Sequence, residues 1–198
     1  RGFDDDVRCF LGDQLVKHGI GLRRGSQVST LDRTNEGLVV TLADGAGTIT
    51  ADAVMYATGR SPNTRGIGLE EAGVELALNG AVVVDDWSRS SVPSIFAVGD
   101  CTDRVNLTPV AIAEGRAFAE THFNKNPMRM DYANIPSAVF SQPPVGSVGL
   151  SEAAARRLGA TDVYVSRFRP MKHTLSGRDE MAMMKLVVSR ETDRVLGC

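Results

Sequence analysis

The chain has 198 residues, of which 42% are hydrophobic and 23% are charged, and its formal net charge is −2. This composition is typical of a globular protein with one large domain or two small ones. The small net charge argues against a nucleic-acid-binding protein, and no apolar run approaches the ~20 residues of a membrane span. We therefore expect no nucleic-acid partner and no membrane partner.

The three cysteines, Cys9, Cys101 and Cys198, lie far apart and form no CxxC spacing, and the three histidines are equally scattered. This usage predicts unpaired thiols in a reducing compartment and no metal site. The chain begins without Met and stops at "DRVLGC", within a strand pattern. We interpret it as an internal piece of a longer chain, expected in the cytoplasm, or in an organelle if a transit peptide lies upstream.

The first third of the chain predicts a helix followed by short strands. In "DDDVRCFLGDQLVKHGI" the apolar residues recur at helical spacing up to Gly19. The segment "LVVTLADGAGTITADAVMYATGR" predicts a strand, a turn at Asp44-Gly45, a second strand and an apolar strand over Ala53–Ala57. The next segment, "SPNTRGIGLEEAGVELALNG", predicts a connector with one helical turn.

The remaining elements alternate between strands and helices. Two strands are predicted at Ala81–Val84 and Ser94–Val98, and a helix runs from Pro109 to about Phe123. The Asn- and Pro-rich segment "NKNPMRMDYANIPS" marks a domain boundary. After it come a strand, a helix opened by Ser151-Glu152, another strand and a final hairpin. This order predicts an α/β and α+β fold.

The segment "SIFAVGDCTDRVNLTPVAIAEGR" carries the main chemical signal. Its strand ends on Gly99 and Asp100, at the edge of a sheet where ligands bind in open α/β folds. Gly99 would permit a close backbone approach, and Asp100 could accept hydrogen bonds from sugar hydroxyls. Thr108 is a candidate N-cap before Pro109, and the amides of Leu107 and Thr108 would lie at the positive end of the helix dipole. These local features alone are equally typical of a plain strand-loop-helix.

The longer pattern resembles the second flavin-binding motif of the pyridine nucleotide-disulfide oxidoreductases. Further matches run in the same order through the chain: "RGFD", "YATGRSPNT", "YANIPSAVFSQPPVGSVGLSE" and "KLVVSRETDRVLGC". The resemblance implies FAD and NADPH as cofactors. It also implies three parts: the end of a Rossmann-like NADPH domain at 1–60, the second segment of the FAD domain at 61–129, and the first part of an interface domain at 130–198.

The resemblance carries cofactor roles onto particular residues. Asp100, after Gly99, would bond the ribitol of FAD, and the backbone at Leu107 and Thr108 would face the flavin ring. The residues that it places at or near NADPH are Arg1, Gly59, Arg60, Asn106 and Ala138.

Arg116 bears on the substrate. In the members of this family that reduce glutathione disulfide, an arginine here contacts a substrate carboxylate, so Arg116 favours that substrate by charge complementarity. A solvated arginine pairing with Glu120 is the alternative. The neighbouring Glu114 departs from the small residue usual in the family, and we expect it on the surface.

The family's redox-active CxxxxC pair is absent from the chain, and none of its histidines matches the catalytic His-Glu pair. The resemblance places the cysteines upstream and the His-Glu pair downstream, so we assign no catalytic residue here. It also implies a homodimer formed through the C-terminal part. Two alternatives stay open: another reductase of the family, acting on trypanothione, mercuric ion or lipoamide, and a non-catalytic flavin-fold fragment.

Overall fold

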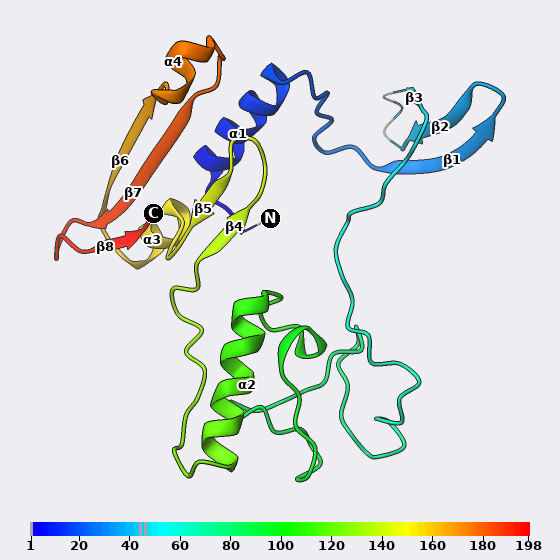
Figure 1. Cartoon of the computed structure of the whole chain (residues 1–198), viewed down its shortest axis with the longest axis vertical. Helices are drawn as coiled ribbons and strands as arrows, with labels where there is room; N and C mark the ends of the chain where they lie inside the picture. Colours follow the sequence, from blue (N-terminus) through cyan, green and yellow to red (C-terminus); the bar gives the residue numbers. More distant parts are fainter. Residues whose placement is uncertain (1, 44, 46) are drawn as a thin grey trace. The chain divides into compact units, whose positions relative to one another are not determined.

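The computed structural model describes residues 2–43, 45 and 47–198. The chain divides into two compact units (Figure 1). The first unit joins Arg1–Val54 to Tyr132–Cys198, and the second is Met55–Asp131. The sequence-based division at 60 and 129 remains a prediction about domains of a larger protein.

The first unit begins with helix α1 (Asp5–Lys17), as predicted. Its N-cap is Asp4, whose carboxylate accepts the N–H of Asp6 at 3.0 Å. Acidic residues occupy the first turn and Lys17 the last, which is the distribution that the helix dipole favours. Gly19, with φ +82°, follows the C-cap and ends the helix.

An antiparallel sheet follows, in the order β1-β2-β3. Its strands are β1 (Val28–Thr34), β2 (Gly37–Leu42) and β3 (Thr48–Ala51). The predicted strands on either side of the Asp44-Gly45 turn are confirmed, whereas β1 was not predicted and Asp44 lies outside the described residues. Every residue of β1 is exposed, so its sequence lacks the apolar alternation that marks a half-buried strand.

The strand predicted over Ala53–Ala57 is wrong. These residues pair with no strand among the described residues, and Met55 and Tyr56 are 86% and 61% exposed. The apolar run is typical of a buried strand, but a strand needs a neighbour for its backbone N–H and C=O groups. Without that neighbour the segment forms no ladder.

The C-terminal part of the first unit contains two further sheets, β4-β5 and β6-β7-β8. Their strands are β4 (Ser137–Val139), β5 (Val145–Ser147), β6 (Thr161–Phe168), β7 (Ala182–Ser189) and β8 (Val195–Gly197). Helix α3 (Glu152–Leu158) begins after Ser151, whose hydroxyl accepts the N–H of Ala154. The predicted helix start, the strand after it and the final hairpin are confirmed, whereas α4 (Lys172–Ser176) was not predicted.

The second unit is built mostly from turns. Its regular elements are the 3-10 turn η1 (Gly99–Thr102) and helix α2 (Thr108–His122), and the helix confirms the prediction. The strands predicted at Ala81–Val84 and Ser94–Val98 are reduced to the single bridges Leu76↔Val82 and Arg89↔Phe96.

A turn centred on Asp85 lies between these two segments. The carboxylate of Asp85 accepts the N–H groups of Trp87 and Arg89 at 2.8 and 2.9 Å. Within the predicted strands, the N–H groups of Val82 and Ala97 donate to the carbonyls of Cys101 and Ser88 at 2.8 and 3.0 Å, so these segments do not pair with each other. The apolar residues of the predicted strands still enter the core, where Ala81 and Val82 are buried.

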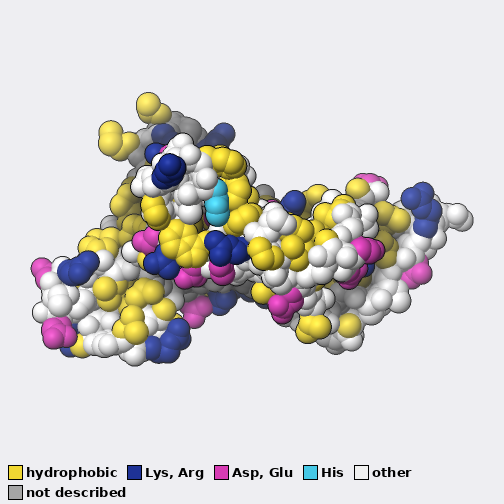
Figure 2. Space-filling model, turned by 90° about the horizontal axis from the view of Figure 1, so that it is seen from below, with side chains coloured by type: hydrophobic (Ala, Val, Ile, Leu, Met, Phe, Trp, Pro, Cys, Tyr) yellow, Lys and Arg dark blue, Asp and Glu magenta, His cyan; other side chains and the backbone are white. Residues whose placement is uncertain are grey.

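No helix in the described part of the chain has the length and apolar character needed to cross a membrane. On the face shown in Figure 2, the described side chains intersperse hydrophobic, basic and acidic groups. This distribution agrees with the small net charge of −2.

Candidate functional site

The turn η1 positions the carboxylate of Asp100. Its Thr102 hydroxyl donates to the carbonyl of Gly99 at 2.8 Å, and Asp103, in the left-handed conformation with φ +50°, ends the turn. The side chain of Asp100 is 49% exposed, and its Oδ2 lies 3.6 Å from Nε of Arg60. The structure therefore brings together two residues that the sequence assigned to different cofactors.

Helix α2 begins one residue earlier than predicted, so the assignment of Thr108 as its N-cap is wrong. Leu107 is the N-cap, because its carbonyl accepts the N–H groups of Val110 and Ala111 at 3.0 and 3.1 Å. Its backbone is extended, and its side chain makes no capping hydrogen bond. Pro109 lies in the first turn, where its missing N–H is no loss. Within the described part of the chain, the N–H of Thr108 has no acceptor. It is a free donor at the positive end of the helix.

The remaining predicted cofactor contacts are more dispersed. Asn106 is exposed, and its side-chain amide donates to the carboxylate of Asp103 at 2.7 Å. Gly59 is exposed, with φ +141°. Ala138 is an exposed residue of β4 opposite Gly146 and belongs to the first unit. Arg1 lies outside the described residues.

Arg116 is exposed on α2. The alternative reading, an ion pair with Glu120, is not formed: Glu120 instead accepts the side-chain amide of Asn126 at 3.2 Å. Among the described residues no side chain bonds to the guanidinium of Arg116. A free cation of this kind is available to an anionic ligand.

The expectation that Glu114 lies on the surface is wrong, and this residue is the one that sequence reasoning missed. Its side chain is 1% exposed, within the buried face of α2 between Val110 and Ala117. Its Oε2 accepts the N–H of Gly99 at 2.5 Å, and its Oε1 lies 3.2 Å from Nη2 of Arg104. The spacing from Val110 to Ala117 places position 114 on the apolar stripe of the helix, and that signal could have found it.

Cys101, beside Asp100, is half-buried, and its thiol donates to the carbonyl of Val98 at 3.2 Å. Burial raises the pKa of this thiol above its usual value, with the carboxylates of Glu114 and Asp100 acting in the same direction. A raised pKa disfavours the nucleophilic thiolate. All three cysteines are unpaired, and among the described residues no group of His, Cys, Asp or Glu could hold a metal ion.

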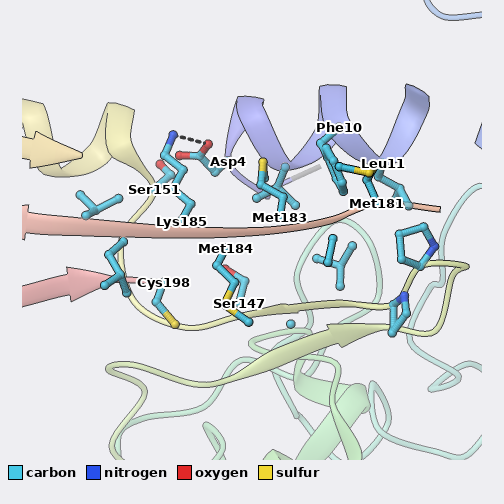
Figure 3. A pocket seen from close by; sticks show the side chains of 18 of the residues that line it. Asp4, Phe10, Leu11, Ser147, Ser151, Met181, Met183, Met184, Lys185 and Cys198 are labelled. Atoms are coloured by element: carbon cyan, nitrogen blue, oxygen red, sulfur yellow. Dashed lines mark hydrogen bonds and ion pairs between the residues drawn. The ribbon is translucent and has the colours of Figure 1, made fainter. Parts of the chain in front are cut away.

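A separate polar cluster lies in the first unit, where Lys185 of β7 meets three carboxylates, of which Figure 3 shows that of Asp4. Its Nζ lies 2.7–2.8 Å from oxygens of Asp4, Asp6 and Glu152. Burial alone would lower the pKa of Lys185, but the three hydrogen bonds raise it well above its usual value. The cluster therefore joins the start of α1 to β7 and α3.

The cluster borders a pocket of about 750 Å³ in the same unit. Figure 3 shows Phe10, Leu11 and Met183 on one side of β7 and Met184 and Cys198 on the other. The walls are mostly apolar, and none of the predicted site residues that the structure describes lines them. The predicted site residues that the structure describes all lie in the second unit, except Ala138.

Comparison with known families gives two matches. Residues 1–115 match the family described as "Pyridine nucleotide-disulphide oxidoreductase". Residues 135–198 match its "dimerisation domain". The segment that carries Asp100, Thr108 and Glu114 falls within the first match.

Similar curated proteins include glutathione reductases and a trypanothione reductase. A glutathione reductase of Burkholderia cepacia is 54% identical over the whole chain, and the chloroplastic/mitochondrial glutathione reductase of Pisum sativum is 48% identical over the whole chain. A trypanothione reductase of Trypanosoma congolense is 38% identical over 98% of the chain. The chain spans only 44%, 36% and 39% of these proteins, respectively.

Among solved structures, the flavoprotein disulfide reductase RclA of Escherichia coli is similar, with a TM-score of 0.87 and 25% sequence identity. The match covers 99% of the chain and 45% of that protein. The predicted mixed fold, with strands and helices alternating along the chain, is confirmed by this match.

Proposed function

Since the chain belongs to the pyridine nucleotide-disulphide oxidoreductase family, we propose that it contributes to an FAD-dependent enzyme that reduces glutathione disulfide with NADPH. The reaction consumes one NADPH, one proton and one glutathione disulfide, and yields NADP⁺ and two glutathione molecules. The proposal concerns a protein of the relatives' length, of which these 198 residues would be a part. The redox cysteine pair and the catalytic His-Glu pair would come from outside this segment.

One observation carries the proposal: an exposed carboxylate and a free helix-terminal amide stand on adjoining elements. Asp100 offers acceptor oxygens suited to the ribitol hydroxyls of FAD. The N–H of Thr108 is suited to an oxygen of the flavin ring, and no acidic residue in the first turn of α2 opposes a negative charge there. The donor and acceptor set therefore fits the cofactor.

Bound FAD would supply two-electron transfer between NADPH and a disulfide. The protein's own contribution would be to orient the cofactor and to stabilise negative charge at the ring through the amide of Thr108. Leu107, as the extended N-cap, would set the direction of that amide. Asp100 would fix the sugar-like chain at a second point.

For NADPH we propose contacts near Gly59 and Arg60, with Asn106 and Ala138 close to the nicotinamide and Arg1 at the 2′-phosphate. The support is chemical. The guanidinium of Arg60 is 78% exposed and is held only loosely by Asp100 at 3.6 Å. Such an arginine can turn toward an anionic ligand, because guanidinium offers forked donors to phosphate.

Arg116 supports glutathione disulfide as the substrate. It is exposed and has no ion-pair partner among the described residues, so its charge is available to a substrate carboxylate. The similarity to a trypanothione reductase makes trypanothione disulfide the second candidate substrate.

The assembly and the compartment are also proposals. The match of residues 135–198 to a dimerisation domain supports a homodimer formed through the C-terminal part. We propose the NADPH, FAD and interface roles for residues 1–60, 61–129 and 130–198, respectively. Three unpaired cysteines suit a reducing compartment, the cytoplasm or an organelle interior.

Steady-state kinetics test this function. We expect NADPH oxidation with glutathione disulfide to have a kcat/KM at least about 100-fold above that with trypanothione disulfide or lipoamide, since charge selection is worth a few kcal/mol. A preference for either rival substrate would replace the proposed one. A protein without flavin absorbance and without activity on any disulfide would support the non-catalytic alternative.

A further inference from the structure

The buried carboxylate of Glu114 lies at a place where an apolar residue would be expected. Its side chain is 1% exposed, and its helical neighbours at this level, Val110 and Ala117, are buried as well. An ionised carboxylate is expensive to bury unless each oxygen has a hydrogen-bonding or charged partner. The partners of Glu114 therefore indicate what the residue does.

The two oxygens of Glu114 bracket the turn that carries Asp100. Oε2 accepts the N–H of Gly99, the residue before Asp100, and Oε1 lies 3.2 Å from the guanidinium of Arg104, four residues after it. Arg104 also donates to the hydroxyl of Ser88 at 3.2 Å. The carboxylate thus ties η1 and the loop after it to the second turn of α2.

Gly99 makes this contact possible. Its backbone has φ +74°, and an added Cβ would lie 3.0 Å from the Cβ of Ala111 on α2. The small residue at position 99 is therefore explained by the close approach of the turn to the helix. At the same point the N–H of Gly99 reaches Glu114.

We propose that Glu114 is a positioning residue for the flavin site: it fixes the turn of Asp100 against the helix that presents the amide of Thr108. This inference rests on the proposed function. Asp100 stands on η1 and Thr108 begins α2, so the hydrogen bond from Gly99 to Glu114 sets the spacing between the two cofactor contacts. Without that bond each contact survives, but the pair is no longer held in one geometry.

A purely structural role for Glu114 makes a different prediction. If the hydrogen bond of Glu114 only stabilises the unit, its loss should weaken FAD binding no more than the loss of any other buried hydrogen bond in that unit. Thr64 offers the matched control: it is 3% exposed, and its hydroxyl donates to the carbonyl of Gly80 at 2.6 Å in the same unit. Thr64→Val removes a buried hydrogen bond that does not touch the Asp100 turn.

The test compares Glu114→Leu, Glu114→Gln and Thr64→Val in the full FAD-binding protein. FAD affinity is measured by quenching of flavin fluorescence, and amide exchange at Gly99 is measured in the FAD-free protein. Glu114→Leu is expected to weaken FAD binding at least about tenfold, as loss of a charged hydrogen bond implies, and to speed exchange at Gly99. Glu114→Gln keeps an acceptor for the Gly99 N–H, so its FAD affinity and its exchange rate at Gly99 should lie within about threefold of the native values. Thr64→Val should leave both near the native values.

Two results overturn the inference while leaving the proposed function intact. One is native FAD affinity in Glu114→Leu, and the other is an equal loss in Thr64→Val. Equally weak FAD binding in Glu114→Gln and Glu114→Leu would also overturn it, because a hydrogen-bond acceptor at position 114 would then not be what supports FAD binding. If the native protein binds no FAD, the proposed function itself fails, and this inference fails with it.

Discussion

Replacing Lys185 by methionine would remove the cation from a point where three carboxylates converge. The side chain of Lys185 is 5% exposed, and its Nζ lies 2.7–2.8 Å from Asp4, Asp6 and Glu152. Removing one partner of a buried ion pair costs about 3–5 kcal/mol, because it strands the remaining charge. The carboxylates of Asp6 and Glu152 are 46% and 28% exposed, so water screens part of the repulsion. We expect a loss of about 2–4 kcal/mol in the local stability of this unit.

Amide hydrogen exchange of α1 and β7 is the assay, because it reports the opening of this unit without requiring two-state unfolding of the whole protein. A loss of that size corresponds to exchange faster by a factor of roughly 30 to 1,000. The control is Arg190→Met. Arg190 pairs with Asp162 at 2.6 Å but is 64% exposed, and its replacement should leave exchange unchanged. Unchanged exchange in Lys185→Met, or equal acceleration in the control, would refute the reasoning.

The same cluster predicts a dependence on pH. Hydrogen bonds from Lys185 lower the pKa of Glu152 below its usual 4.5. Burial alone would raise the pKa of Asp4, but hydrogen bonds from Lys185 and from backbone amides bring it below 3.8. A carboxyl group with a lowered pKa stabilises the folded state above its unfolded pKa, and this is lost as the pH falls through the folded value. The deficit of Lys185→Met should therefore be full at neutral pH and shrink below about pH 4, as acid titration by circular dichroism would show.

Three further predictions concern other residues. Arg116→Ala should raise the KM for glutathione disulfide about tenfold with little change in kcat, and an unchanged KM would exclude a substrate contact. Gly99→Ala should destabilise the protein by about 1–2 kcal/mol and reduce its FAD content, since its φ is +74° and its Cβ would crowd Ala111; native melting and full FAD content would contradict this. Glu180 is buried, and the hydrogen bond with His173 at 2.9 Å lowers its pKa. Glu180→Gln should therefore cost about 1–3 kcal/mol at pH 7 in denaturant titrations, with a smaller deficit in acid; the idea fails if the deficit is the same at pH 7 and pH 3.

The helices were predictable from the sequence because their signals are local. Helix α1 has an acidic first turn and a glycine after its end, and α2 has Pro109 in its first turn. The strands at Ala53–Ala57 and Ala81–Val84 were not predictable in the same way. Strand formation depends on a partner elsewhere in the chain, and apolar composition does not say whether that partner is present.

The cofactor roles of the site residues stay predictions, but their surroundings can be compared with the structure. The motif predicted roles for Asp100 and Thr108; the structure presents Asp100 as an exposed carboxylate and the N–H of Thr108 without an acceptor among the described residues. Glu114 was expected on the surface, because it departs from the small residue usual at this place in the family. Only the folded chain reveals that the N–H of Gly99 and the guanidinium of Arg104 are partners of that carboxylate, since both lie more than a helical turn away in sequence.

The most direct test of the central claim is a pair of anaerobic half-reactions on the purified full-length protein. NADPH should change the visible absorbance spectrum of the flavin, and glutathione disulfide added afterwards should restore the original spectrum. Asp100→Ala should reduce the amount of bound FAD in the same preparation. A flavin spectrum that NADPH does not change, or that glutathione disulfide does not restore, would contradict the account.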